Sequence, residues 1–87
     1  MTQRQVTKTG KDRDGDITSV CHPGAYWSPR SKLDTIRDIE TGEHQYYVPW
    51  THSEPTLIRV VDGPNGKYLR TDRDKTSKNN LADLKDC

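Results

Sequence analysis

Residues 26–42, YWSPRSKLDTIRDIETG, form the stretch that decides the fold of this chain. Ser31 is predicted to be a helix N-cap, because its hydroxyl can accept the backbone N–H of Asp34. Pro29 offers a rival start, since proline is favoured at the first helical position. Gly42 can take the left-handed conformation that ends a helix. The stretch therefore predicts a helix of about three turns that ends before Gly42.

The predicted helix has one apolar edge, because Leu33, Ile36 and Ile39 recur at three-residue spacing. Its opposite face is expected to be wet and carries Lys32, Asp34, Arg37, Asp38 and Glu40. Such a short helix is not stable alone in water, so it must pack on a sheet. Tyr26 and Trp27 precede it, and we expect them to pack back onto it as a hydrophobic staple rather than to form an exposed anchor for a partner.

Segments on both sides of the helix have the composition of short strands. They are residues 17–21 before the helix and residues 45–50, 56–61 and 67–71 after it, with a further strand or a loose segment near residues 5–8. Residues 63–66, GPNG, predict a tight hairpin turn. The expected fold is a small α+β domain of order β-β-α-β-β-β, an antiparallel meander with the helix packed on one face.

The 87 residues are too few for two hydrophobic cores, so we expect a single domain spanning residues 1–87. Its ordered core is expected at about residues 16–71. The segments 1–11 and 72–87 are expected to be loosely ordered or docking tails, with Leu81 and Leu84 as docking residues. The chain has no Phe and few aliphatic residues, so two Trp and four Tyr must complete the core. A dimer that buries more aromatic surface is compatible with so thin a core.

Bulk properties exclude several classes of protein. The formal net charge is +1, which creates no strong field toward nucleic acid or membranes. No apolar run approaches the roughly 20 residues needed to cross a bilayer, and the N-terminal residues lack the apolar segment of a signal peptide. We therefore expect a soluble, cytoplasmic protein with no membrane partner. In that setting Cys21 and Cys87 are expected to be reduced, with a disulfide between them as the open alternative.

Five short motifs together resemble a family of small bacterial and phage-encoded domains of unknown function. They are WSPRSK at 27–32, IRDIE at 36–40, YYVPW at 46–50, GPNGKYLRT at 63–71 and NNL at 79–81. The resemblance covers roughly residues 16–87. It implies a compact domain that is often a whole protein, and it brings no catalytic or binding residues with it.

Two groups of residues suggest metal chemistry, and neither has the required spacing. Residues 12–16, DRDGD, resemble the opening of a calcium loop, but the loop positions for glycine and glutamate hold Ile17 and Pro23. An acidic turn is the expected structure. The candidate zinc ligands are Cys21, His22, His44, His52 and Cys87, and they form no C-x-x-C or H-x-x-x-H pattern. We assign no metal and no cofactor.

A thiol nucleophile is the remaining catalytic candidate. Cys21 could use His22 or His44 as its base. However, adjacent residues such as Cys21 and His22 point to opposite faces of a strand, and no oxyanion donor is evident. We assign no catalytic residue. A small metal-dependent or thiol-based enzyme that uses Cys21 and the histidines stays the alternative function.

The late strands combine aromatic and basic residues. The candidate binding residues are Tyr46, Trp50, Arg59, Lys67, Tyr68 and Arg70. Sheets that present aromatic rings flanked by cations hold single-stranded nucleic acids in several small folds. The same aromatic residues are also the ones that a core short of aliphatic residues needs. The leading hypothesis is a non-catalytic binding or interaction module, with a protein as the first expected partner and nucleic acid as the second.

Overall fold

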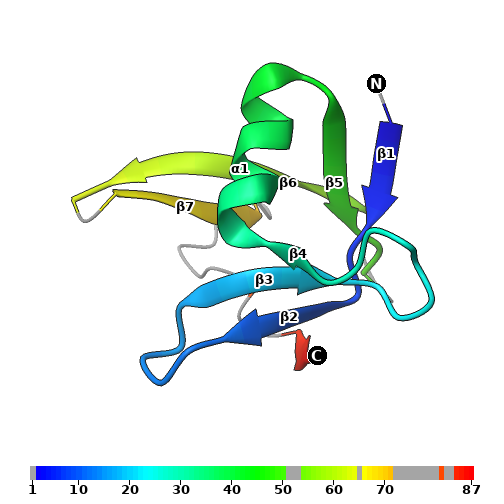
Figure 1. Ribbon diagram of the computed structural model, residues 1–87, viewed down its shortest axis with the longest axis horizontal. Coiled ribbons are helices and arrows are strands. Elements are labelled where there is room, and N and C mark those ends of the chain that lie inside the picture. The colour runs from blue at the N-terminus through cyan, green and yellow to red at the C-terminus, as the bar shows by residue number, and fades with distance from the viewer. Residues whose placement is uncertain (1, 51–53, 65, 72–80, 82–83) are drawn as a thin grey trace.

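A computed structural model of the chain shows an α+β domain in which one helix contacts strands of two sheets (Figure 1). The structure describes residues 2–50, 54–64, 66–71, 81 and 84–87. The first sheet has the order β1 (Thr2–Gln5), β5 (His44–Val48), β6 (Thr56–Gly63) and β7 (Gly66–Thr71). The second has the order β4 (Arg30–Ser31), β3 (Ile17–Cys21), β2 (Lys8–Lys11) and β8 (Lys85–Asp86). The helix is α1 (Lys32–Thr41).

Both predicted ends of the helix are confirmed. The hydroxyl of Ser31 accepts the backbone N–H of Asp34 at 3.1 Å. Gly42 has a φ of 79° and donates its N–H to the carbonyl of Ile39 at 3.2 Å. The rival start at Pro29 is not used, because the two residues after it pair with β3 as strand β4.

The predicted helix face is wrong in two places. Leu33 is 74 % exposed, whereas Asp38, expected on the wet side, is only 2 % exposed. The buried helical residues are Thr35, Ile36 and Asp38, and Ile39 is partly buried against the core. The helix is thus rotated away from the Leu33 edge. The rotation brings the Asp38 carboxylate to arginine and tyrosine side chains that lie elsewhere in the chain.

The N-terminal segment is not a loose tail. Strand β1 runs parallel to β5, with Arg4 opposite Tyr46. Strand β2 then pairs antiparallel with β3, with Thr9 opposite Val20. Val6 lies between the two strands and is fully buried. The first residues therefore connect the two sheets, which explains their order despite their polar composition.

The predicted antiparallel meander is present in strands β5, β6 and β7. Tyr47 lies opposite Leu57, and Val60 lies opposite Leu69. Gly63 pairs with Gly66 at the tight turn, where Gly66 has a φ of 114°; Asn65 lies outside the described residues. The α+β class is confirmed, but the order β-β-α-β-β-β is not. The structure adds β1, β4 and β8 and divides the strands between two sheets.

The core lies between the helix and the inner faces of the two sheets. Its buried residues are Val6, Ile17, Val20, Ile36, Tyr46, Val48, Ile58, Leu69 and Leu81. Leu84 packs against this core, so both predicted docking leucines of the C-terminal segment do dock. Residues 72–80 and 82–83, which belong to the same predicted tail, lie outside the described residues.

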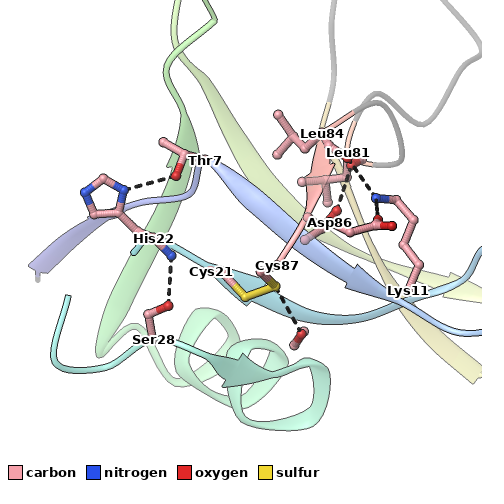
Figure 2. Close-up of a disulfide and its surroundings, with 11 residues drawn as sticks. Thr7, Lys11, Cys21, His22, Ser28, Leu81, Leu84, Asp86 and Cys87 are labelled. Carbon is pink, nitrogen blue, oxygen red and sulfur yellow. Dashed lines mark hydrogen bonds and ion pairs between the residues drawn. A yellow bond between two sulfur atoms is a disulfide. The ribbon is translucent and has the colours of Figure 1, made fainter. Parts of the chain in front are cut away.

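The expectation of reduced cysteines is wrong, because Cys21 and Cys87 form a disulfide (Figure 2). Strand β8 lies beside β2, which pairs with β3. The N–H of Cys87 donates to the carbonyl of Thr9 at 3.2 Å. The end of the chain is thereby carried to the end of β3, where Cys21 lies. The two residues are far apart in sequence and adjacent in the fold.

Candidate functional site

Asp38 lies at the centre of a buried polar cluster built from four elements. Arg30 of β4 donates to both of its carboxylate oxygens, each at 3.0 Å. The hydroxyl of Tyr46, on β5, donates to Oδ2 of Asp38 at 2.5 Å. Arg4 of β1 donates in turn to that tyrosine hydroxyl at 2.9 Å. One helical carboxylate therefore ties the helix to strands of both sheets.

Aromatic rings enclose the guanidinium of Arg4. Its carbon lies 5.4 Å from the ring centre of Trp27, 5.7 Å from that of Tyr46 and 5.9 Å from that of Tyr26. Trp27 meets Tyr46 edge-on at 5.7 Å between ring centroids. Trp27 is partly buried and packs against the core, where its described ring contact is with Tyr46 of β5 rather than with the helix. The prediction that Tyr26 packs back onto the helix is wrong, because Tyr26 is 90 % exposed.

The charges in this cluster are fixed rather than poised for proton transfer. Burial alone would raise the pKa of Asp38, but the hydrogen bonds from Arg30 and Tyr46 outweigh it and hold that pKa below its usual value. Burial, together with the hydrogen bond to Asp38, raises the pKa of Tyr46. The hydrogen bond to Asp38 also raises the pKa of Arg30. A carboxylate that stays ionised and a phenol that stays neutral serve as structural groups near pH 7.

The stability of the protein is expected to fall in acid because of Asp38. Its folded-state pKa lies below the ordinary value of 3.8. The ionised carboxylate therefore stabilises the fold above about pH 4, and this contribution is lost as the pH falls through the lowered pKa. The slope of the unfolding free energy against pH approaches about 1.4 kcal/mol per pH unit for one proton.

Urea unfolding between pH 2 and pH 6 measures this slope. Asp38→Asn should reduce the pH dependence of the unfolding free energy, whereas Asp34→Asn, on the same helix, should leave that dependence unchanged. An unchanged slope in Asp38→Asn would contradict the assignment of the acid sensitivity to Asp38.

Three of the six predicted binding residues do not lie on a common binding face with the other three. Tyr46 is fully buried, which corrects its assignment to a binding face. Trp50 is partly buried and donates its indole N–H to the hydroxyl of Thr56 at 3.1 Å. Lys67 pairs with Glu40 of the helix at 2.5 Å, and this hydrogen bond raises the pKa of Lys67.

The other three predicted binding residues lie together on the β6–β7 hairpin. Arg59 is directly opposite Arg70, and Val61 is directly opposite Tyr68. Directly opposed side chains project from the same face of a sheet. The helix covers the other face, because the alternating residues Ile58 and Leu69 belong to the core. We call the uncovered residues the outer hairpin face: Leu57, Arg59, Val61, Tyr68 and Arg70.

The outer hairpin face exposes apolar surface beside its cations. Leu57 is 43 % exposed and Tyr68 is 38 % exposed. Arg59 is exposed and Arg70 is half-buried. Tyr, Arg and apolar anchors are the residue types that carry binding energy at protein interfaces. Sequence reasoning did not select Leu57 or Val61, although period-two alternation from Arg59 places both on its face.

A groove runs along β7 at the edge of the first sheet. Its volume is about 380 Å³. Four successive residues of β7, from Gly66 to Leu69, line one side, and Lys32 lines the groove at the start of the helix. The remaining lining comes from the end of β6 and the turn after it, Gly63 and Pro64, and from the end of the β2–β3 connection and the start of β3, Gly15, Asp16 and Ile17. We call this hollow the edge groove. In Figure 1 the tip of the β6–β7 hairpin and the β2–β3 connection project toward the same side of the molecule.

A second hollow of about 420 Å³ lies where β6 continues past its pairing with β5. Ile39 and Glu40 from the end of the helix line it together with Gln45 of β5. On β6 it is lined by Leu57, Ile58, Arg59, Val60 and Asp62. Its lining mixes both signs of charge with apolar side chains.

The thiol needed by the alternative enzyme hypothesis is absent, because both cysteines are in the disulfide. The ring Nδ1 of His22 lies 3.2 Å from the hydroxyl of Thr7 (Figure 2), and His52 lies outside the described residues. The thiol-based form of that hypothesis is therefore wrong for the oxidised protein.

Two groups of side chains in the described residues lie close enough to share a cation. The exposed one is Asp12, Asp14 and Asp16, and the other is Asp38, Glu43 and His44. In the first, a carboxylate oxygen of Asp12 accepts the backbone N–H of Asp14 and of Asp16 at 2.9 and 3.0 Å, which confirms the predicted acidic turn. In the second, the charge of Asp38 is already paired with arginine. The first group and Asp38 of the second thus have structural explanations.

A family model described as a protein of unknown function, DUF3892, matches residues 5–85. No curated protein and no solved structure matches the chain. Within the described residues, no helix combines the length and the apolar character needed to cross a membrane.

Proposed function

The chain belongs to the DUF3892 family of proteins of unknown function, and we propose that it is a non-catalytic interaction module. In this proposal a protein partner binds the outer hairpin face. The buried cluster around Asp38 gives the domain a fixed shape. The helix packs on one face of the β6–β7 hairpin, and the outer hairpin face is available to a partner.

The gathering of exposed apolar and basic residues on one face of the hairpin is the observation that carries this proposal. Arg59 lies directly opposite Arg70 on that face. An acidic partner surface would add charge-assisted hydrogen bonds to the guanidinium groups. Tyr68, Val61 and Leu57 lie beside the arginines and offer apolar contact to the same partner. The expected partner is therefore an acidic protein surface with apolar side chains among its carboxylates.

Charge reversal on the outer hairpin face is expected to abolish partner capture. The immobilised chain is exposed to an extract of the native host, and the retained proteins are identified and their affinities measured. Arg59→Glu/Arg70→Glu should lower the affinity of a specific partner at least tenfold, which is about 1.4 kcal/mol. The matched control, Arg13→Glu/Arg37→Glu, changes two exposed arginines that do not belong to the outer hairpin face and should keep the affinity.

Nucleic acid is the second candidate partner, and the same variants separate it from protein. Fluorescence polarisation with single-stranded oligonucleotides at low and physiological salt measures the affinity for nucleic acid. Weak binding that disappears at physiological salt is expected from so few cations. Tight oligonucleotide binding with no protein capture would contradict the protein-binding proposal, as would equal protein capture by both double variants.

The disulfide supports a working site for the chain in an oxidising compartment rather than in the cytoplasm expected from the sequence. Thiol blocking at the moment of cell lysis, followed by mass measurement of the chain, tests this. Two blocked cysteines in the isolated chain would contradict the oxidised state.

A further inference from the structure

We propose that Cys87 is a thiol–disulfide exchange site for a low-molecular-weight thiol that carries carboxylate groups. The reactive bond is the disulfide between Cys87 and Cys21. It is attached to the second sheet, whereas the outer hairpin face belongs to the first, so this inference does not depend on the proposed interaction function. Exchange places the incoming thiol on Cys87 and returns Cys21 to its thiol form.

The first support is that the two halves of the disulfide differ in accessibility. Cys87 is exposed, whereas Cys21 is only 3 % exposed. Exchange begins when a thiolate attacks one of the two sulfur atoms, and its rate depends on access to that sulfur. The attacking thiolate approaches from the side opposite the leaving sulfur. A thiolate in solvent therefore attacks Cys87, with Cys21 as the leaving group.

The second support is that the disulfide lies on the face of the second sheet that is turned away from the core. Val20 and its register partner Thr9 are fully buried. Cys21 follows Val20 in β3, so its side chain points to the opposite face of the sheet. Val20 belongs to the core cluster, whereas Cys21 does not. The disulfide is thus placed on the side from which solvent can reach the sheet.

Two lysines share this face with the disulfide. Lys8 of β2 is the register partner of Cys21 in β3 and of Lys85 in β8, so the three side chains project from one face. Cys87 donates its N–H to the carbonyl of Thr9 at 3.2 Å and follows Lys85 by two residues, which places its side chain on the same face. We call these four residues the disulfide face: Lys8, Cys21, Lys85 and Cys87.

The third support is the charge of the disulfide face. The attacking thiolate and the leaving sulfur of Cys21 both carry negative charge, which nearby cations stabilise. Lys8 is half-buried and Lys85 is exposed. Asp86 alternates to the other face and is paired with Lys11 at 2.8 Å. The disulfide face therefore favours a thiol whose own charged groups are carboxylates.

The exchange balances without a separate oxidant or reductant. The sulfur of the incoming thiolate forms a bond with Sγ of Cys87 as the bond from that atom to Sγ of Cys21 breaks. The electron pair of the broken bond goes to Sγ of Cys21, which then takes a proton from water. The incoming sulfur is oxidised to the disulfide level, and Cys21 is reduced. Attack by Cys21 on the mixed disulfide expels the thiol again, so the modification is reversible.

The site of attack is tested with reduced glutathione, a thiol that carries carboxylates. The full oxidised chain is incubated with it, quenched in acid, alkylated with N-ethylmaleimide and mapped by peptide mass spectrometry. The expected product carries glutathione on Cys87 and N-ethylmaleimide on Cys21, in about tenfold or greater excess over the opposite arrangement. Equal labelling of the two cysteines, glutathione mainly on Cys21, or no mixed disulfide would each overturn the inference.

A comparison of two thiols tests the charge of the disulfide face. Cysteamine carries an amine in place of carboxylates, so the ratio of the glutathione rate to the cysteamine rate reports charge. Opening of the fold affects both rates equally and leaves this ratio unchanged. Lys8→Gln/Lys85→Gln should lower the ratio about fivefold at low salt, and high salt should remove most of the difference. The matched control, Lys32→Gln/Arg37→Gln in the helix, should keep the ratio. An equal ratio in Lys8→Gln/Lys85→Gln and the unsubstituted chain would overturn the assignment of an anionic thiol.

Discussion

Reduction of the Cys21–Cys87 disulfide is expected to lower the free energy of unfolding by about 4 kcal/mol. The bond joins residues with a sequence separation of 66, and closing so long a loop removes much of the conformational freedom of the unfolded chain. A domain of this length has a total stability of roughly 4–13 kcal/mol. The bond therefore accounts for a large share of the total, and reduction should also lower Tm by roughly 15–30 °C.

Within the described residues, hydrogen bonds and buried side chains also hold the C-terminal segment. The side-chain amine of Lys11 donates to the carbonyl of Leu84 and to a carboxylate oxygen of Asp86, both at 2.8 Å (Figure 2). The hydroxyl of Thr9 donates to the carbonyl of Leu81 at 3.3 Å. Burial of Leu81 adds apolar contact. These contacts act in the folded state, whereas the disulfide restricts the unfolded chain, so they do not replace it.

Denaturant unfolding with and without a reducing agent measures the loss. The control is Cys21→Ser/Cys87→Ser without reductant, which should match the reduced protein because both lack the cross-link. A second check is hydrogen exchange at Lys85 and Asp86, which should become faster on reduction. Reduced and oxidised proteins whose unfolding free energies agree within about 1 kcal/mol would contradict a structural role for the bond.

Asp38→Ala is expected to lower the free energy of unfolding by about 3–5 kcal/mol. The substitution leaves Arg4, which is 8 % exposed, without its nearby carboxylate, and it removes the acceptor of the Tyr46 hydroxyl. Arg30 loses both of its hydrogen bonds to the helix. A buried cation without its partner is far more costly than a broken surface pair.

The control for Asp38→Ala lies one turn earlier on the same helix. Asp34 is 44 % exposed and pairs with Arg37 in solvent, so Asp34→Ala should cost about 1 kcal/mol or less. Urea unfolding of both variants at pH 7 provides the comparison. If the two variants lose similar amounts of stability, the cluster around Asp38 does not hold the helix to the sheets.

Local signals were sufficient to predict the helix ends and the late hairpin. Ser31 and Gly42 act on backbone groups within four residues of themselves, so the adjacent sequence is enough to predict their roles. The tight turn between β6 and β7 is likewise local. The rotation of the helix could not be predicted from local signals. The three-residue apolar spacing of the helix favours burial of Leu33 over Asp38. The cations that pair with Asp38 come from β1 and β4, and the periodicity of the helix gives no information about them.

The N-terminal strands and the disulfide were missed because their partners are distant in sequence. Strand β1, with the sequence TQRQ, has no apolar residue to mark it, and it pairs with β5 more than forty residues later. Cys21 and Cys87 show no spacing that reveals a bond. Both features depend on the chain crossing from one sheet to the other at Val6.

The shared face of three of the six candidate binding residues could be predicted from the hairpin. Arg59, Tyr68 and Arg70 are related by the register of the tight turn, which fixes the faces of both strands. Tyr46 was misplaced because a core short of aliphatic residues takes its ring. Trp50 and Lys67 depend on side-chain partners in other elements, Thr56 of β6 for Trp50 and Glu40 of the helix for Lys67.

Site-specific photocrosslinking tests the outer hairpin face most directly. A benzophenone amino acid replaces either Leu57, which is 43 % exposed on that face, or Leu33, which is 74 % exposed on the helix. Both variants are irradiated in native extract. We predict a specific protein adduct from position 57 that is lost with Arg59→Glu/Arg70→Glu, and no such adduct from position 33. A stronger adduct from position 33, or none from position 57, would show that the partner does not bind the outer hairpin face.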